Sequence, residues 1–248
     1  MAKYRHLKNA PITEAIIDLR VRPSTEFDIN QLSYLPAALK KQYPRILPVR
    51  TAKGGFRFRD GQLKVEEPQD LGIYAYRFES EDGKQVIQFR KDGFGFSRLK
   101  PYTDWNNVVS EAKKLWQVYS KRMNLECITR VAVRYINHLS IPLPINDFAD
   151  YLTAPPPVPK SIPQAVGSFL TRVVVHDIER QLDANVAQAM ERSTKPDFVT
   201  IILDIDAYKL GEFDVKTDQI WTILDQLRDL KNTIFFGSIT ENTARLFE

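Results

Sequence analysis

The feature that most constrains the fold is a repetition inside the chain. Two short sequences, Ile-Thr and Ile-Asn, return after 116 residues with a similar alternating segment between them: Ile12-Thr13 and Ile29-Asn30 are followed by Ile128-Thr129 and Ile145-Asn146. Thr103-Asp104 likewise returns as Thr217-Asp218 after 114 residues. The repetition predicts two related halves, residues 1–125 and 126–248, which form one compact unit with a pseudo-two-fold axis.

Hydrophobic periodicity predicts the same order of elements in each half: a strand, a helix, several strands and a long helix. In residues 12–22, apolar and charged side chains alternate, which is typical of a strand with one exposed face. Asp28 can cap a helix through Leu39, and Thr103-Asp104 precedes a long amphipathic helix. Between these helices we expect strands, several of them separated by Asp-Gly turns, at 54–59, 62–67, 70–79, 84–91 and 94–99.

The second half repeats this order with a strand, a short helix from Asn146, further strands and a long helix from Thr217-Asp218. Its strands are expected at 128–139, 167–180, 184–191 and 197–207. The proline-rich segment 153–163 favours an extended surface loop. After the long helix, the tail predicts a short apolar segment, a turn at Gly237 and a final helical turn.

These elements predict an α+β fold in which duplicated β-α-β(n)-α halves share a curved, mostly antiparallel sheet backed by helices. The element order resembles the duplicated TATA-binding-protein-like architecture, a likeness that by itself implies no function. Pairing between the first strands of the two halves would remove two exposed edges. Glu14 aligns with Arg130 and Asp18 with Arg134, so opposite charges can meet across these strands.

Composition indicates a soluble cytoplasmic protein. Hydrophobic residues make up 43% of the chain and charged residues 27%, which is ordinary for a globular protein. No apolar segment has the length of a transmembrane helix, and residues 1–11 do not resemble a secretory signal. The single cysteine, Cys127, cannot form an intrachain disulfide and suits a reducing compartment. We expect it to be buried and unreactive.

Several stretches resemble a sporadically distributed, functionally uncharacterised bacterial family of proteins of similar length. The resemblance spans nearly the whole chain and is carried by Asn9-Ala10-Pro11-Ile12 with Glu14-Ala15, Gln88-Phe89-Arg90, Gly93-Phe94, Phe96-Ser97-Arg98-Leu99, Trp105, Arg134-Tyr135-Ile136-Asn137, Leu203-Asp204-Ile205-Asp206, and Phe235-Phe236 with Ser238 and Thr240. It implies a prokaryotic cytoplasmic protein encoded among mobile or defence-associated genes, for example in a toxin–antitoxin-like system. It implies no cofactor and no catalytic residue.

Positive charge is concentrated at the start of the chain. Residues 1–59 hold twelve Lys or Arg against four acids, whereas the remaining 189 residues hold 23 against 27. Seven of these basic residues, interleaved with aromatic ones, make a candidate site for nucleic acid or an acidic protein: Lys40, Lys41, Arg45, Arg50, Lys53, Arg57 and Arg59. The alternative is a solvated helix end and loop without a specific partner.

Four arginines on the predicted first strands make a second candidate surface. Arg20, Arg22, Arg130 and Arg134 extend the basic surface if they face outward, or else pair with Glu14 and Asp18. The apolar C-terminal tail is expected to dock on the sheet, with contact between copies in a homo-oligomer as the alternative.

The sequence holds few signs of enzymatic chemistry. The best metal candidates are His176, Asp204 and Asp206, because the two carboxylates share one face of a strand and could bind Mg²⁺. The alternative is that these acids mark the solvent face of that strand. No nucleophile-elbow, Walker or dinucleotide-binding sequence occurs, and we assign no catalytic residue.

The sequence therefore favours a non-enzymatic, macromolecule-binding protein over an enzyme. A protein partner bound across the curved sheet is the leading hypothesis. A nucleic-acid-binding protein that uses residues 40–59 is the alternative, and a metal-dependent hydrolase is the second alternative.

Overall fold

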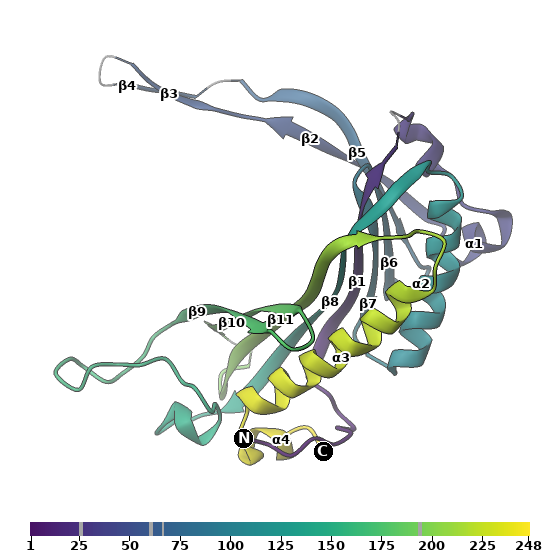
Figure 1. The fold of residues 1–248 in the computed structure, drawn as a ribbon. Helices are drawn as coiled ribbons and strands as arrows, with labels where there is room; N and C mark the ends of the chain where they lie inside the picture. Colours follow the sequence, from purple (N-terminus) through teal and green to yellow (C-terminus); the bar gives the residue numbers. More distant parts are fainter. Residues whose placement is uncertain (25–26, 60–61, 66, 193–194) are drawn as a thin grey trace.

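The computed structural model describes residues 1–24, 27–59, 62–65, 67–192 and 195–248. Within these residues, nine strands form one antiparallel sheet in the order β2-β5-β6-β7-β1-β8-β11-β10-β9, and four α-helices accompany it (Figure 1). A separate hairpin, β3–β4, lies beyond the sheet at the tip of the β2–β5 ribbon. The predicted α+β class and antiparallel sheet are confirmed.

The first half contains β1 (Ile12–Pro23), a 3-10 helix η1 (Ile29–Ser33), α1 (Ala37–Gln42), β2 (Arg45–Lys53), β3 (Phe56–Arg59), β4 (Gln62–Val65), β5 (Gln69–Glu79), β6 (Gln85–Arg90), β7 (Gly93–Leu99) and α2 (Trp105–Ser120). The second half contains β8 (Leu125–Pro142), a 3-10 helix η2 (Phe148–Asp150), β9 (Leu170–Asp177), β10 (Leu182–Arg192), β11 (Phe198–Phe213), α3 (Gln219–Ser238) and α4 (Glu241–Arg245).

The first strands of the two predicted halves, β1 and β8, pair antiparallel at the centre of the sheet, as the sequence predicted. Ile17 and Val133, which hold equivalent positions in the two halves, lie directly opposite each other. From this pair outward, the last strand of each half comes next, β7 on one side and β11 on the other. The internal duplication itself stays a prediction, because strand order alone does not establish a common origin.

Helices α2 and α3 pack on one face of the sheet and leave the other face open (Figure 1). The stripe of α2 is buried as predicted, including Trp105, Trp116 and Tyr119. Asp104 caps this helix by accepting a hydrogen bond from the Asn107 backbone N–H, 2.9 Å away. Each large apolar side chain that this layer buries contributes about 1.5–3 kcal/mol.

The open face is concave. In Figure 1, the β2–β5 ribbon and the β9–β10 hairpin project from opposite ends of the sheet, both away from α2 and α3. The right-handed twist of a large sheet carries its outer strands out of the mean plane in this way. We call these two projections the arms of the sheet.

Three predictions about local structure were wrong. The helix predicted from Asp28 is divided into η1 and α1, because Pro36 disfavours helical backbone at Leu35 and lacks an N–H to donate. No strand was predicted for residues 45–53, which form strand β2 against β5. The turn predicted at Gly237 is absent from this described segment, since α3 continues to Ser238.

The C-terminal tail docks on the body of the protein, as predicted. Phe235 and Phe236 are 6% and 7% exposed, and Phe247, which follows α4, is 9% exposed. Cys127 is buried, also as predicted. None of the described helices combines the length and the apolar character that a membrane span requires.

Candidate binding surface

The open face carries charged side chains from adjacent strands. Successive residues of a strand point to opposite faces. Ile17 and Leu19 are buried under the helices, so Asp18 and Arg20 lie on the face without helices. On the neighbouring strand, the buried Val131 similarly directs Arg130 to the open face. The alternation that builds the core therefore also places the charges.

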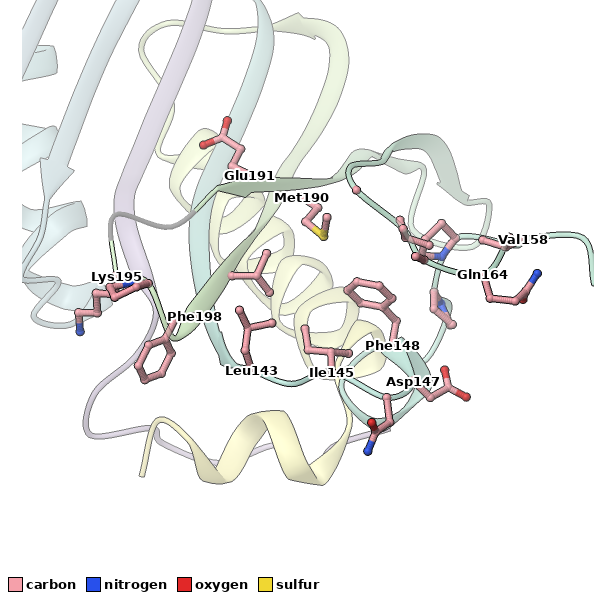
Figure 2. Close-up of a pocket in the computed structure, with 18 residues that line it drawn as sticks. Leu143, Ile145, Asp147, Phe148, Val158, Gln164, Met190, Glu191, Lys195 and Phe198 are labelled. Atoms are coloured by element: carbon pink, nitrogen blue, oxygen red, sulfur yellow. The ribbon is translucent and has the colours of Figure 1, made fainter. Parts of the chain in front are cut away.

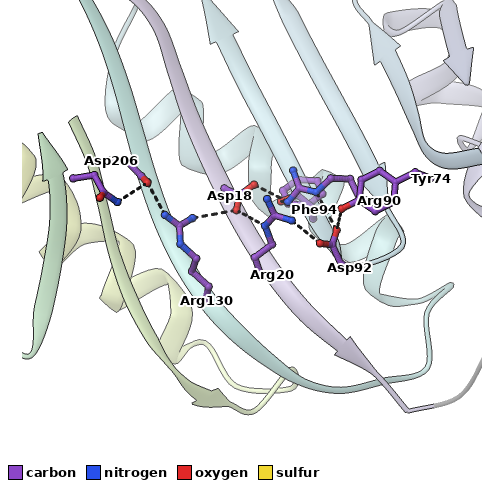
Figure 3. A network of polar contacts seen from close by, with 9 residues as sticks. Asp18, Arg20, Tyr74, Arg90, Asp92, Phe94, Arg130 and Asp206 are labelled. Atoms are coloured by element: carbon purple, nitrogen blue, oxygen red, sulfur yellow. Dashed lines mark hydrogen bonds and ion pairs between the residues drawn. The ribbon is translucent and has the colours of Figure 1, made fainter. Parts of the chain in front are cut away.

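These charges form one connected network across the middle of the sheet (Figure 3). Asp206 of β11 accepts two hydrogen bonds from Arg130 of β8, at 2.7 and 2.8 Å. Arg130 also reaches Asp18 of β1, 3.3 Å away. Asp18 accepts further hydrogen bonds from Arg90 of β6, at 2.6 Å, and from Arg20, at 3.2 Å.

The network ends at Asp92, between β6 and β7. Asp92 accepts a hydrogen bond from Arg20, at 2.6 Å, and another from the Tyr74 hydroxyl, at 2.5 Å. Burial favours the neutral form of Asp92, but the Tyr74 hydrogen bond and the charges of Arg20 and Arg90 outweigh it and lower its pKa. We define the open-face network as Asp18, Arg20, Arg90, Asp92, Arg130 and Asp206.

The network is electrically balanced and partly buried, because its three arginines face three aspartates. The side chains of Arg90 and Asp18 are only 9% and 16% exposed. Removal of one partner from such a pair leaves an uncompensated charge, which costs far more than an exposed ion pair contributes. Each charged side chain of the network thus has an ion-pair partner within it.

All four arginines predicted to face outward lie on this face, and all four are ion-paired. Arg134 donates to Asp204 at 2.9 and 2.5 Å, and this hydrogen bonding raises the pKa of Arg134. Arg22 of β1 donates to Glu212 of β11 at 2.8 Å. The alternative in which these arginines pair with Glu14 and Asp18 holds only for Arg20 and Arg130, which both contact Asp18.

The predicted partners were partly wrong. Asp18 of β1 does form an ion pair with an arginine of β8, but that arginine is Arg130 rather than Arg134. In an antiparallel pair, equivalent residues of two halves lie opposite each other only at the symmetry axis, so alignment does not give the contacts. Asp18 therefore lies opposite Ala132, and Glu14 lies opposite Ile136.

The three metal candidates are not brought together. His176 lies on the edge strand β9 and contacts Asp183 of β10, with 2.6 Å between Nδ1 and Oδ1. Asp204 and Asp206 share one face of β11 as predicted, but they are occupied by Arg134 and Arg130. Across the part of the chain that the structure describes, no three His, Cys, Asp or Glu side chains gather with metal-binding geometry.

The seven basic residues of the 40–59 segment are divided among different elements. Lys40 and Lys41 lie in the last turn of α1, and Lys53 ends β2. On the β2–β5 arm, Arg50 pairs with Asp70 at 2.5 Å and Arg45 with Glu79 at 3.4 Å. Arg57 and Arg59 belong to β3, and their side chains lie outside the described part of the structure.

A hollow of about 750 Å³ lies between the proline-rich loop and the ends of β10 and β11 (Figure 2). Its apolar lining includes Ile145, Phe148 and Met190. Figure 2 shows Glu191 and Asp147 on different sides of the hollow. Sequence reasoning missed this hollow, although the prolines at 155–157 were a signal that the loop stays extended.

Comparisons with known proteins do not assign this chain to a family. The chain matches no known family model and no curated protein. In the described residues, fold and surface together define an α+β protein with a nine-stranded antiparallel sheet, helices on one face and a network of charged side chains on the other. The resemblance to the sporadically distributed bacterial family stays a prediction.

Proposed function

We propose that this protein is a non-enzymatic binding protein that holds a protein partner on the open face of its sheet. The observation that supports this most is the open-face network, which crosses the sheet from β6 to β11 without a helix above it. Ordered charges of both signs suit a partner whose surface carries the complementary pattern. The arms at both ends of the sheet would limit how that partner is oriented.

The charge balance favours a protein partner over nucleic acid at this face. Binding to a phosphate backbone depends on unneutralised Lys and Arg side chains, which displace counterions. On the open face, Arg20, Arg90 and Arg130 are already neutralised by aspartates. A polyanion would have to compete with those aspartates for every arginine.

The state of the network also favours binding over acid–base catalysis. A general acid or base works best when its pKa lies near the operating pH. The pKa of Asp92 is instead lowered, because Tyr74, Arg20 and Arg90 stabilise the carboxylate against the effect of burial. The bacterial family resemblance further suggests a partner from a mobile or defence-associated system, and this part of the proposal depends on that resemblance alone.

A charge swap tests the proposal. In the double variant Arg134→Asp with Asp204→Arg, the ion pair between β8 and β11 is preserved but its polarity on the surface is reversed. We expect near wild-type thermal stability and at least about a tenfold loss of affinity for a partner captured from native lysate, because like charges then face the partner. The matched control reverses Arg5 and Glu241, an ion pair 2.9 Å long near the chain termini, and should retain the partner.

Two results would contradict the proposal. One is a partner that binds the open-face double variant as tightly as wild type, since the binding surface then lies elsewhere. The other is nucleic acid in the eluate that is lost with rising salt and with Lys40→Glu and Lys41→Glu, which would identify the basic segment as the functional surface.

A further inference from the structure

The edge strand β9 (Leu170–Asp177) is exposed in an unusual way for a soluble protein. It pairs with β10 on one side only and is the last strand of the sheet. Its apolar side chains are largely solvent-exposed: Leu170 is 75%, Val173 58%, Val174 47% and Val175 42% exposed. Apolar residues on both faces and an unpaired backbone edge together make a template for another strand.

The opposite edge of the same sheet is protected, which makes β9 stand out. Strand β2 contains Pro48, which has no N–H to donate, and the charged Arg45, Arg50 and Lys53. Its pairing with β5 is also interrupted by two register shifts, near Arg50. Proline, charge and bulges are the usual means of preventing edge-to-edge association. Strand β9 pairs with β10 through eight consecutive residue pairs without such a shift.

The hydrogen-bond pattern shows which groups of β9 are free to pair outward. The Met190 N–H donates to the Phe169 carbonyl, 3.0 Å away, and this register continues along the two strands. In an antiparallel ladder, hydrogen-bonded and non-hydrogen-bonded pairs alternate. The odd-numbered residues of β9 therefore bond to β10. The even-numbered ones, Arg172, Val174 and His176, direct their N–H and C=O groups to the open edge.

We propose that β9 pairs antiparallel with β9 of a second copy of this chain, about a two-fold axis at Val174. This register places Val173 of each copy opposite Val175 of the other, on the same face of the joined sheet. Because this two-fold axis is perpendicular to the sheet, the open faces of the two copies lie on the same side of the joined sheet. The valines exposed in one copy thus become neighbours in the pair.

Charge complementarity favours a second copy in this register. Arg172 of each copy lies opposite His176 of the other, and His176 is held by Asp183, 2.6 Å away. The long guanidinium side chain can therefore reach the partner's carboxylate across the imidazole, twice per dimer by symmetry. A register centred on Val173 would instead place Arg172 opposite Val174 and would lose both contacts.

The dimer extends beyond the proposed binding function. Two nine-stranded sheets would join into one continuous layer, with both open faces on the same side. A partner with repeated or elongated structure could then contact both faces at once. The dimer does not depend on the proposed partner, so each proposal can fail separately.

Sedimentation velocity of the purified full chain over a wide concentration range tests the dimer. One chain has a mass of 28.6 kDa. We expect wild type to form a species of twice this mass as its concentration rises. Val174→Lys should remain monomeric, because it places a charge on the two-fold axis. The matched control Val49→Lys, on the protected edge β2, should dimerise like wild type. Circular dichroism spectra that match wild type would show that both variants fold.

A second measurement fixes the register. Val174→Cys places one thiol per copy at the axis, whereas the native Cys127 is buried. Mild oxidation should give a disulfide-linked dimer of Val174→Cys but not of Val49→Cys, because opposed residues lie within disulfide distance. Monomeric wild type at all concentrations, or a dimer that survives Val174→Lys, would overturn the proposal. Loss of a different bound protein by Val174→Lys, with wild type monomeric, would show strand addition by another chain instead.

Discussion

Substitution of Lys231 gives the sharpest test of the packing between α3 and the sheet. Lys231 is a lysine of α3 that is only 7% exposed. Its Nζ donates to Asn232 Oδ1 at 2.6 Å and lies 3.7 Å from the centre of the Tyr135 ring, so no carboxylate is among these contacts. Burial, together with the nearby charge of Arg228, lowers its pKa from 10.5 to about 7.

The sign of the pH dependence follows from these values. Between pH 7 and 10.5, the unfolded chain keeps the Lys231 proton while the folded protein has lost it. The free energy of unfolding therefore rises with pH over this range. Between about pH 6 and about pH 9, this single group changes the stability by roughly 2 to 3 kcal/mol. The upper limit of the range stays below the titration of tyrosine, at about pH 10.

The assay is urea unfolding of wild type and Lys231→Met at several pH values. Methionine keeps an unbranched side chain of similar volume and removes the charge, so the variant should lose this rise with pH. It should also be more stable than wild type at and below neutral pH, where the wild-type lysine is charged. A constant stability difference between the two proteins at all pH values would refute the reasoning, because Lys231 would then keep the same protonation state throughout.

Three further predictions concern stability. Asp18→Ala should lower the free energy of unfolding by about 3 kcal/mol, since Arg90 loses its closest partner. The control Glu212→Ala removes an exposed ion pair and should cost less than about 1 kcal/mol. Equal costs of the two variants in urea unfolding would contradict a buried network. Asp104→Ala should cost about 1 kcal/mol by removing the α2 cap, and an unchanged melting temperature would refute that role. Because the pKa of Asp92 is lowered, its contribution to stability is present above its unfolded pKa and lost as pH falls, so Asp92→Asn should flatten the acid limb of the stability profile.

Much of the fold could be predicted from local patterns. The alternation in residues 12–22 gave β1, and the stripe after Thr103-Asp104 gave α2 with its buried Trp116. Such predictions succeed because a residue's face within a strand or helix depends only on its neighbours in sequence. Strand β2 was missed for the same reason: its charged and proline-containing sequence has no apolar alternation, and only β5 beside it supplies the hydrogen bonds.

The candidate surface was predictable in its residues but not in its contacts. Alternation alone placed Arg20, Arg130 and Arg134 on the exposed face. Their partners depend on antiparallel register and on strands far away in sequence, such as β11, which supplies Asp206 to Arg130 and Asp204 to Arg134. The sequence offered no signal that Asp204 and Asp206 would form ion pairs with arginines rather than bind a metal ion.

The sequence by itself determined elements such as β1 and α2 and which of their side chains face outward, because periodicity and capping act over a few residues. Only the tertiary structure decided that β9 is left at an open edge, that acids and arginines neutralise each other across the central strands, and that Lys231 is enclosed beside Tyr135. Each of these depends on the distance between segments separated by tens of residues or more. Charge pairing and burial act through space, so they are fixed only when the sheet is assembled.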